Sequence, residues 1–177
     1  VGPRFPIFWH SKKIINTPWA TITLTADGWC LNAGIDESNA NGQLILLPTK
    51  PFETAWQIRQ YLLKKFSLKQ LGVIITDTKN LPLRVGTICR TLSYAGFEPL
   101  KSYVGKKDLF GRKSRLTQSN VADALATSAG LVMGEGNEQI PLALITGAPV
   151  KFTNKNISNS KNKNLSLAPE KDIFAKV

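Results

Sequence analysis

Cysteine and histidine are scarce in this sequence. It contains two cysteines, Cys30 and Cys89, and one histidine, His10, among 177 residues. Two cysteines do not make a disulfide framework, and they suit a reducing, cytoplasmic setting. Three sulfur and nitrogen ligands are too few for the usual four-ligand zinc site, so the sequence argues against zinc. We expect His10 to lie on the surface or in a loop rather than to act as a base.

Long apolar runs are also absent. No stretch approaches the roughly 20 apolar residues that a helix needs to cross a bilayer. The N-terminus lacks the charged segment followed by a long apolar segment that marks a signal peptide. We therefore expect no membrane partner. The chain begins at Val1 rather than at methionine, so we expect further residues upstream.

Acidic residues are few compared with basic ones. The 23 Lys and Arg residues outnumber the 12 Asp and Glu residues, which gives a formal net charge of +11. This balance favours anionic partners such as nucleic acid, nucleotides or acidic small molecules. The alternative is that the charge simply covers solvated helix faces and loops. Lysines gather after Pro149 among Asn and Ser, so we expect a flexible basic tail at 151–177, outside one domain at 1–150.

The pattern of apolar residues predicts a domain with both helices and strands. Alternating or short apolar runs predict strands at residues 19–25, 29–33, 43–47, 71–75 and 142–145. Helical spacing predicts helices at 51–66, opened by Pro51, and at 117–133, capped by Thr117 and ended by Gly134. Residues 87–95 stay open between strand and helix. The predicted fold class is α+β (α/β-like), with mixed β-sheets and packed helices.

Two aspartates stand at the ends of predicted strands. Asp36 lies in the polar stretch 30–39, and Asp77 closes the apolar run that begins at Leu71. A loop at a strand end can aim side chains from a rigid sheet, and a ligand crevice is expected there. Carboxylate oxygens are hard ligands that suit Mg²⁺ or Mn²⁺. The alternative is that each aspartate only caps nearby backbone N–H groups.

Two glycine-containing stretches can contact anions. Gly134 and Gly136 let backbone N–H groups approach a phosphate, while Glu135 between them can reach a metal. The alternative is that Gly134 is an ordinary helix end. Residues 105–113 form a basic stretch with two glycines, which can wrap an anion or serve as a solvated connection.

An ordered series of short motifs runs from about Trp29 to Gly147. Residues 32–39 read Asn-Ala-Gly-Ile-Asp-Glu-Ser-Asn. The motifs that follow are Leu46-Leu47-Pro48, Val73-Ile74-Ile75-Thr76-Asp77-Thr78, Pro82-Leu83-Arg84-Val85-Gly86-Thr87, Tyr103-Val104-Gly105, Asp108-Leu109-Phe110-Gly111-Arg112, Val121-Ala122-Asp123 and Leu131-Val132-Met133-Gly134-Glu135-Gly136. This series resembles the γ-glutamyl ligases that act on the deazaflavin coenzyme F-420. The run at 134–139 looks closer to a branch assigned to folate polyglutamylation.

The resemblance implies a GTP-dependent ligase that joins L-glutamate through an amide to a carboxylate acceptor, by way of an acyl phosphate. The acceptor would be a coenzyme F-420 precursor or folate, and ATP is the alternative nucleotide. It also implies a homodimer, divalent metal (Mg²⁺ or Mn²⁺) on Asp36 and Asp77, and a second ion beside Thr78. Asn39 would contact the nucleotide, and Gly134, Glu135 and Gly136 would lie on the phosphate and metal side. Charge alone makes Lys106, Lys107 and Arg112 candidates for neutralising the anionic acceptor.

The sequence departs from the family pattern in several places. The family carries an upstream segment with a nucleotide-binding lysine, and residues 2–6 do not match it, so we expect that segment to be missing here. Asn80-Leu81 replaces a Gly-Arg pair, and Cys89 stands where the pattern has an aspartate. A second hypothesis is therefore a non-catalytic protein derived from this family that binds an anionic partner such as nucleic acid.

Overall fold

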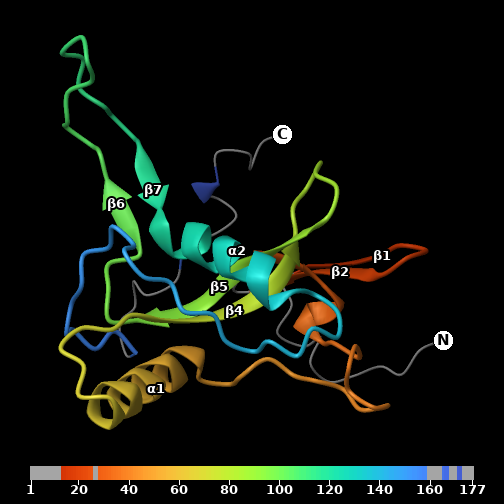
Figure 1. Cartoon of the computed structure of the whole chain (residues 1–177). Coiled ribbons are helices and arrows are strands. Elements are labelled where there is room, and N and C mark those ends of the chain that lie inside the picture. Colours follow the sequence, from red (N-terminus) through yellow and green to blue (C-terminus); the bar gives the residue numbers. More distant parts are fainter. Residues whose placement is uncertain (1–12, 26–27, 159–164, 168–170, 173–177) are drawn as a thin grey trace. The chain divides into compact units, whose positions relative to one another are not determined.

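The computed structural model describes residues 13–25, 28–158, 165–167 and 171–172 (Figure 1). The expectations for His10 and for the rest of residues 1–12 lie outside these ranges. The described chain has a mixed α and β structure and divides into two compact units. Unit 1 comprises residues 1–49, 79–86 and 161–177, and unit 2 comprises residues 50–78 and 87–160.

Unit 1 is built on a three-stranded antiparallel sheet in the order β1–β2–β3. The strands are β1 (Lys13–Asn16), β2 (Thr21–Thr25) and β3 (Gly28–Leu31). The alternating pattern at 19–25 predicted a strand, and β2 confirms it, although the strand begins at Thr21. Strand β3 is shorter than predicted, because the chain leaves it after Leu31 and enters the one-turn element η2 (Asn32–Gly34).

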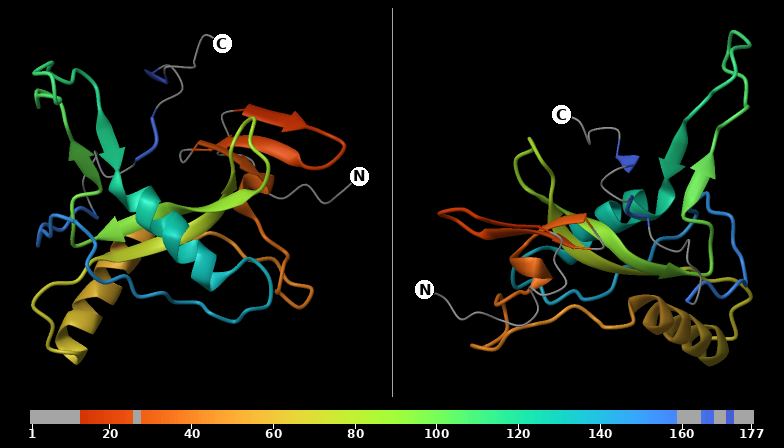
Figure 2. Two further views of the ribbon diagram at one scale, coloured as in Figure 1. Left: turned by 45° about the horizontal axis from the view of Figure 1, so that its top comes forward. Right: turned by 180° about the vertical axis from the view of Figure 1, so that it is seen from behind.

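Unit 2 is built on a two-stranded sheet of β4 (Val73–Asn80) and β5 (Thr87–Ala95). The helices α1 (Pro51–Lys65) and α2 (Val121–Met133) both pack on β5. Figures 1 and 2 show that they lie on opposite sides of the sheet. The open question at 87–95 is thus resolved as a strand, and both predicted helices are present.

The core of unit 2 joins α1 to the sheet. The rings of Phe52 and Phe97 both contact Tyr94, with centroids 5.6 and 5.7 Å from it. Arg59 is 2% exposed. Its guanidinium donates to the backbone oxygen of Leu71 (2.8 Å) and to Oδ1 of Asn154 (2.7 Å). Arg59 therefore ties the helix to two segments that are distant from it in sequence.

A hairpin that follows β5 and precedes α2 in the sequence extends from unit 2. Its strands are β6 (Leu100–Ser102) and β7 (Gln118–Asn120), which pair antiparallel. Beyond them, backbone hydrogen bonds from Tyr103 to Thr117 (2.9 Å) and from Gly105 to Ser114 (2.8 Å) continue the pairing. The basic stretch at 105–113 is therefore the outer end of a paired hairpin rather than a wrapping loop.

Three predicted strands need correction. Residues 43–47 and 142–145, all within the described ranges, form no strand; only Ile45 makes an isolated bridge, to Asp36. Their apolar residues are mostly exposed, which shows that a short apolar run alone does not guarantee a pairing partner. Strand β4 begins at Val73, inside the run predicted at 71–75, and continues to Asn80, so Asp77 lies within the strand and does not end it.

The cap of α2 and the start of the tail also differ from prediction. Asn120, not Thr117, caps α2: its side chain accepts a hydrogen bond from the backbone N–H of Asp123. Gly134 ends the helix as predicted. The predicted tail begins with residues that pack on unit 2. The backbone N–H of Glu98 donates to the backbone oxygen of Lys151 (2.9 Å), and the backbone N–H of Thr153 donates to that of Gly96 (2.9 Å).

Neither α1 nor α2 has the length and apolar character of a bilayer-spanning segment, and the rest of the described chain contains no such helix.

Candidate functional site

The turn that leads to Asp36 has an unusual backbone. Asn32, Ala33 and Gly34 have φ angles of 48°, 56° and 77°. Residues other than glycine rarely adopt this left-handed region of backbone angles, which costs on the order of 1–3 kcal/mol per strained residue. The turn is held by Thr23, which is fully buried: its hydroxyl accepts from the N–H of Ala33 (3.1 Å) and donates to the backbone oxygen of Cys30 (3.1 Å). Strand β2 therefore fixes the path of the chain just before Asp36.

The Asp36 carboxylate is held in one orientation by Ser38. It accepts a hydrogen bond from the N–H of Ser38 (2.8 Å) and from its hydroxyl (2.8 and 2.6 Å to the two oxygens). The hydrogen bond from the Ser38 hydroxyl, followed by that from its backbone N–H, lowers the pKa of Asp36. The backbone of Asp36 also pairs with that of Ile45. Asp36 thus caps its own turn, as the alternative interpretation expected, and presents an exposed, ionised carboxylate.

Asn39 follows in the same loop and has a φ angle of 53°. It is exposed and lies in unit 1 together with Asp36. Asp77, Thr78 and Glu135 all belong to unit 2. The structure therefore supports two groups of candidate residues, one in each unit, and the predicted pairing of Asp36 with Asp77 remains a prediction.

The unit 2 group brings together residues that are far apart in the sequence. The hydroxyl of Thr78 on β4 donates to Oε2 of Glu135 (2.8 Å), which lies just after α2. The thiol of Cys89 on β5 donates to the other oxygen, Oε1 (3.6 Å). Burial raises the pKa of the Cys89 thiol, and the nearby negative charge of Glu135 acts in the same direction. We call Thr78, Cys89 and Glu135 the Glu135 cluster.

Asp77 precedes Thr78 on β4. Successive side chains of a strand point to opposite faces of the sheet. The negative charge of Asp77 nevertheless contributes to raising the pKa of the Cys89 thiol, so the Asp77 carboxylate lies within electrostatic reach of the Glu135 cluster. The assignment of Asp77 and Thr78 to two different ions, which the resemblance implies, stays a prediction.

The loop after α2 already binds a carboxylate. Gly134 has a φ angle of 77° and donates its N–H to the backbone oxygen of Gly130 (2.9 Å). The N–H of Gly136 donates to Oε2 of Glu138 (2.8 Å), and a side chain at position 134 would collide with that carboxyl group. The amide of Gly136 thus faces an anion, as a phosphate-binding role requires. Glu138 was not predicted, although it lies only four residues after Gly134.

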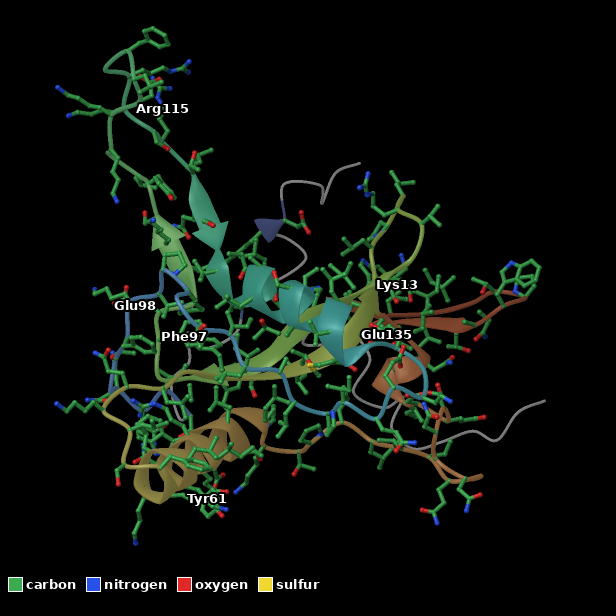
Figure 3. All side chains as sticks on the ribbon, viewed as in Figure 1. Lys13, Tyr61, Phe97, Glu98, Arg115 and Glu135 are labelled. Carbon is green, nitrogen blue, oxygen red and sulfur yellow. The ribbon has the colours of Figure 1, made fainter. Side chains whose placement is uncertain are left out.

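The predicted acceptor-binding cations lie elsewhere in unit 2. Lys106, Lys107 and Arg112 are exposed on the β6–β7 hairpin. Figure 3 shows Arg115, near the outer end of the hairpin, at the opposite end of unit 2 from Glu135. Within one unit, the structure does not bring these cations to the Glu135 cluster.

The donor groups fit the chemistry of the predicted ions. Carboxylate and hydroxyl oxygens suit Mg²⁺ and Mn²⁺, which usually bind through one or two carboxylates completed by water and substrate phosphates. Among the described residues, no three or more His, Cys, Asp or Glu side chains are arranged to hold an ion by themselves. An ion at the Glu135 cluster would therefore take part of its coordination from water or phosphate.

Sequence reasoning overlooked two members of these groups. It noted Cys89 only as a departure from the family pattern, although that departure was itself the signal that this position faces the site. It gave Ser38 no role, although Ser38 follows Asp36 at the spacing of an Asx turn.

Comparison with known proteins places these residues in context. Residues 7–147 match the family model described as F420-0:Gamma-glutamyl ligase. The match begins upstream of Trp29, where the motif series had placed the start of the similarity. It includes the Asp36 loop, β4 and the Glu135 cluster.

Curated relatives of the chain include several coenzyme F420:L-glutamate ligases. The coenzyme F420:L-glutamate ligase of Methanococcus maripaludis is 40% identical over 167 residues, which cover 93% of this chain and 65% of the relative. That of Methanocaldococcus jannaschii is 40% identical over 154 residues, covering 86% and 59%. That of Methanosarcina mazei is 39% identical over 149 residues, covering 82% and 58%. The chain thus spans less than two thirds of the length of these relatives.

Proposed function

Because the chain belongs to the F420-0:γ-glutamyl ligase family, we propose that it acts in a nucleotide- and divalent-metal-dependent ligase that joins L-glutamate to a carboxylate acceptor through an amide bond. The observation that carries this proposal is the family match over residues 7–147. It is supported by the contact of Thr78 with Glu135, which joins two motifs separated by 57 positions. The relatives named above act on coenzyme F420, as their names state.

The proposed reaction has two steps. A carboxylate is a poor electrophile, so an acceptor oxygen first attacks the terminal phosphate of GTP, which forms an acyl phosphate and releases GDP. The amine of L-glutamate then attacks the acyl carbon, inorganic phosphate leaves, and the amine gives up a proton. In such phosphoryl transfers the protein mainly positions the reactants and neutralises charge. ATP is the alternative nucleotide.

The proposed roles follow the two groups of residues. Asp36 and Asp77 would hold one divalent ion, and Thr78 and Glu135 would hold a second. Mg²⁺ or Mn²⁺ would neutralise phosphate oxygens there. Asn39 would contact the nucleotide, and the amides of the Gly134–Gly136 loop would contact phosphate. The carboxylate of Glu138 on the N–H of Gly136 supports this last role, because it shows an anion at that amide.

The acceptor and the assembly are further parts of the proposal. We take a coenzyme F-420 precursor as the first candidate acceptor and folate as the second, with Lys106, Lys107 and Arg112 available for its negative charge. We also propose a homodimer with the fold of this family, in a cytoplasmic setting. The exposed side chains of Leu109 (96%) and Phe110 (95%) on the hairpin support a surface that is covered in the assembly.

Product formation tests the proposal. The chain is incubated with L-glutamate, GTP or ATP, Mn²⁺ or Mg²⁺, and either the deazaflavin acceptor or folate, and products are identified by mass spectrometry. We expect one acceptor to gain glutamyl units with release of GDP. Glu135→Gln should reduce the rate about 100-fold, as removal of a charge-stabilising group does. Glu98→Gln, an exposed glutamate paired with Lys151, is the control. Turnover by Glu135→Gln at the normal rate would refute the role of Glu135.

One observation favours the second candidate, a nucleic-acid-binding protein. On the hairpin, the amino groups of Lys101 and Lys106 lie 5.5 and 5.2 Å from the ring centroid of Tyr103, and Phe110 of the same hairpin is exposed. Aromatic and basic side chains in one surface can stack bases and track phosphates. Fluorescence anisotropy with single-stranded RNA at two salt concentrations decides this. Salt-sensitive binding that is weakened by Phe110→Ser supports it, and no binding at low salt excludes it.

A further inference from the structure

The Glu135 cluster contains a sulfur atom where the rest of the site offers oxygen. We propose that the thiolate of Cys89 is a ligand of the ion at this cluster and makes that position prefer thiophilic divalent cations, such as Zn²⁺ and Co²⁺, over Mg²⁺. This inference rests on the proposed function, because it concerns an ion of the same site. Cys89 is one of two free cysteines, and nothing in the proposed reaction otherwise uses it.

The separation of the donor atoms supports shared coordination. Sγ of Cys89 lies 3.6 Å from Oε1 of Glu135. Around a tetrahedral ion, a metal–sulfur bond of about 2.3 Å and a metal–oxygen bond of about 2.1 Å place the two donors roughly 3.6 Å apart. The two side chains thus have the spacing of neighbouring ligands without rearrangement. In the structure the thiol proton points to Oε1. When the ion binds, this proton is released to solvent and the thiolate sulfur coordinates the ion.

Packing fixes the position of the sulfur. A side chain at Gly130 of α2 would place its Cβ 2.6 Å from Sγ of Cys89, so the helix can approach the strand only because position 130 is glycine. The hydroxyl of Thr127 donates to the backbone oxygen of Cys89 (2.9 Å). Cys89 is 7% exposed, whereas Thr78 and Glu135 are exposed. The sulfur is therefore held in place by α2 and lies beside the exposed carboxylate of Glu135.

The composition of the cluster sets its metal preference. Thiolate is a soft ligand that favours Zn²⁺ and similar ions, whereas carboxylate and hydroxyl oxygens alone favour Mg²⁺ and Mn²⁺. Thr78 adds one oxygen donor through its hydroxyl, 2.8 Å from Oε2 of Glu135. The remaining positions would be filled by water or by phosphate oxygens of the nucleotide. An aspartate at position 89 would make the same cluster an all-oxygen site.

Cobalt spectroscopy tests the sulfur–metal bond directly. Co²⁺ is titrated into the chain, and the near-ultraviolet sulfur-to-cobalt charge-transfer band is recorded. We expect the band in the unaltered chain, its loss in Cys89→Ser, and its retention in Cys30→Ser, the matched control with the other buried cysteine. Glu135→Gln, a change at an exposed residue that cannot disturb the core, should weaken Co²⁺ binding about 10-fold or more. Absence of the band in the unaltered chain, or its survival in Cys89→Ser, overturns the inference.

A second measurement separates this inference from the proposed function. The affinities for Zn²⁺ and Mg²⁺ are compared, in the presence of GTP, for the unaltered chain and for Cys89→Asp. We expect the ratio of Zn²⁺ to Mg²⁺ affinity to fall at least about 10-fold in Cys89→Asp. An unchanged ratio overturns the role of Cys89 and leaves the ligase proposal standing. Failure of both proteins to bind any divalent ion overturns both.

Discussion

At the scale of single residues, Thr23 controls the loop that carries Asp36. Its side chain has no exposed surface, and its hydroxyl is the partner of the N–H of Ala33 in the left-handed turn. Valine has nearly the same shape but no hydroxyl, so Thr23→Val would leave a buried N–H without an acceptor. We predict that Thr23→Val lowers the free energy of unfolding by about 2 kcal/mol.

Urea unfolding of Thr23→Val and of a control measures this effect. Thr21→Val is the control, because the hydroxyl of Thr21 bonds only to the exposed side chain of Asn16. It should change the free energy of unfolding by less than about 0.5 kcal/mol. Equal effects of the two substitutions would show that the Thr23 hydroxyl does not hold the turn.

The pair of Asp36 and Ser38 gives a prediction about pH. Because the hydrogen bonds from Ser38 lower the pKa of Asp36 in the folded chain, its contribution to stability is present above the pKa of the unfolded chain. It is lost as the pH falls through the folded-state pKa. Asp36 is exposed, so solvent screening keeps this contribution small. NMR titration should show a higher Asp36 pKa in Ser38→Ala and no change in Ser119→Ala, and an unchanged pKa in Ser38→Ala would contradict the account.

At the scale of elements, Arg59 joins α1 to the rest of unit 2. Its guanidinium donates hydrogen bonds to both Leu71 and Asn154, and a side chain at Gly96 would collide with it. Arg59→Met keeps the apolar stem but removes both donors. We predict a loss of about 2–3 kcal/mol in the free energy of unfolding, the range for hydrogen bonds from a charged group. The measurement is denaturation followed by tryptophan fluorescence, and the control is Gln60→Ala, a change at an exposed residue of α1. Comparable stability of the two variants would argue against the role of Arg59 in joining α1 to the rest of unit 2.

The elements also show what the sequence could reveal. Pro51 and the 3.6-residue spacing after it predicted α1 well, because both signals are local. The cap of α2 was misplaced because Thr117 and Asn120 are both good capping residues, and only the pairing of β7 with β6 determines where the helix can start. The short apolar run at 142–145 predicted a strand, but a strand also needs a partner, and partners are not encoded locally.

At the scale of the whole molecule, the candidate residues are divided between the two units: Asp36 belongs to unit 1, and Thr78 and Glu135 belong to unit 2. Motif order predicted Asp36, Asp77, Thr78 and Glu135 as site residues without a structure, and the structure brings two of them, Thr78 and Glu135, into contact. The membership of Cys89 in the Glu135 cluster could not be predicted, since it depends on the close approach of α2 at Gly130. The same holds for the cations of the hairpin, whose separation from Glu135 becomes visible only when the hairpin is folded.

The most direct test of the central claim is nucleotide binding measured by calorimetry. GTP and ATP are titrated into the chain with Mg²⁺, with Mn²⁺ and without metal, and the same is done with Asp36→Asn. The account predicts metal-dependent binding, tighter for GTP, that Asp36→Asn weakens at least about 10-fold. Metal-independent binding, or equal binding by Asp36→Asn, would contradict the claim that this loop holds an ion for the nucleotide.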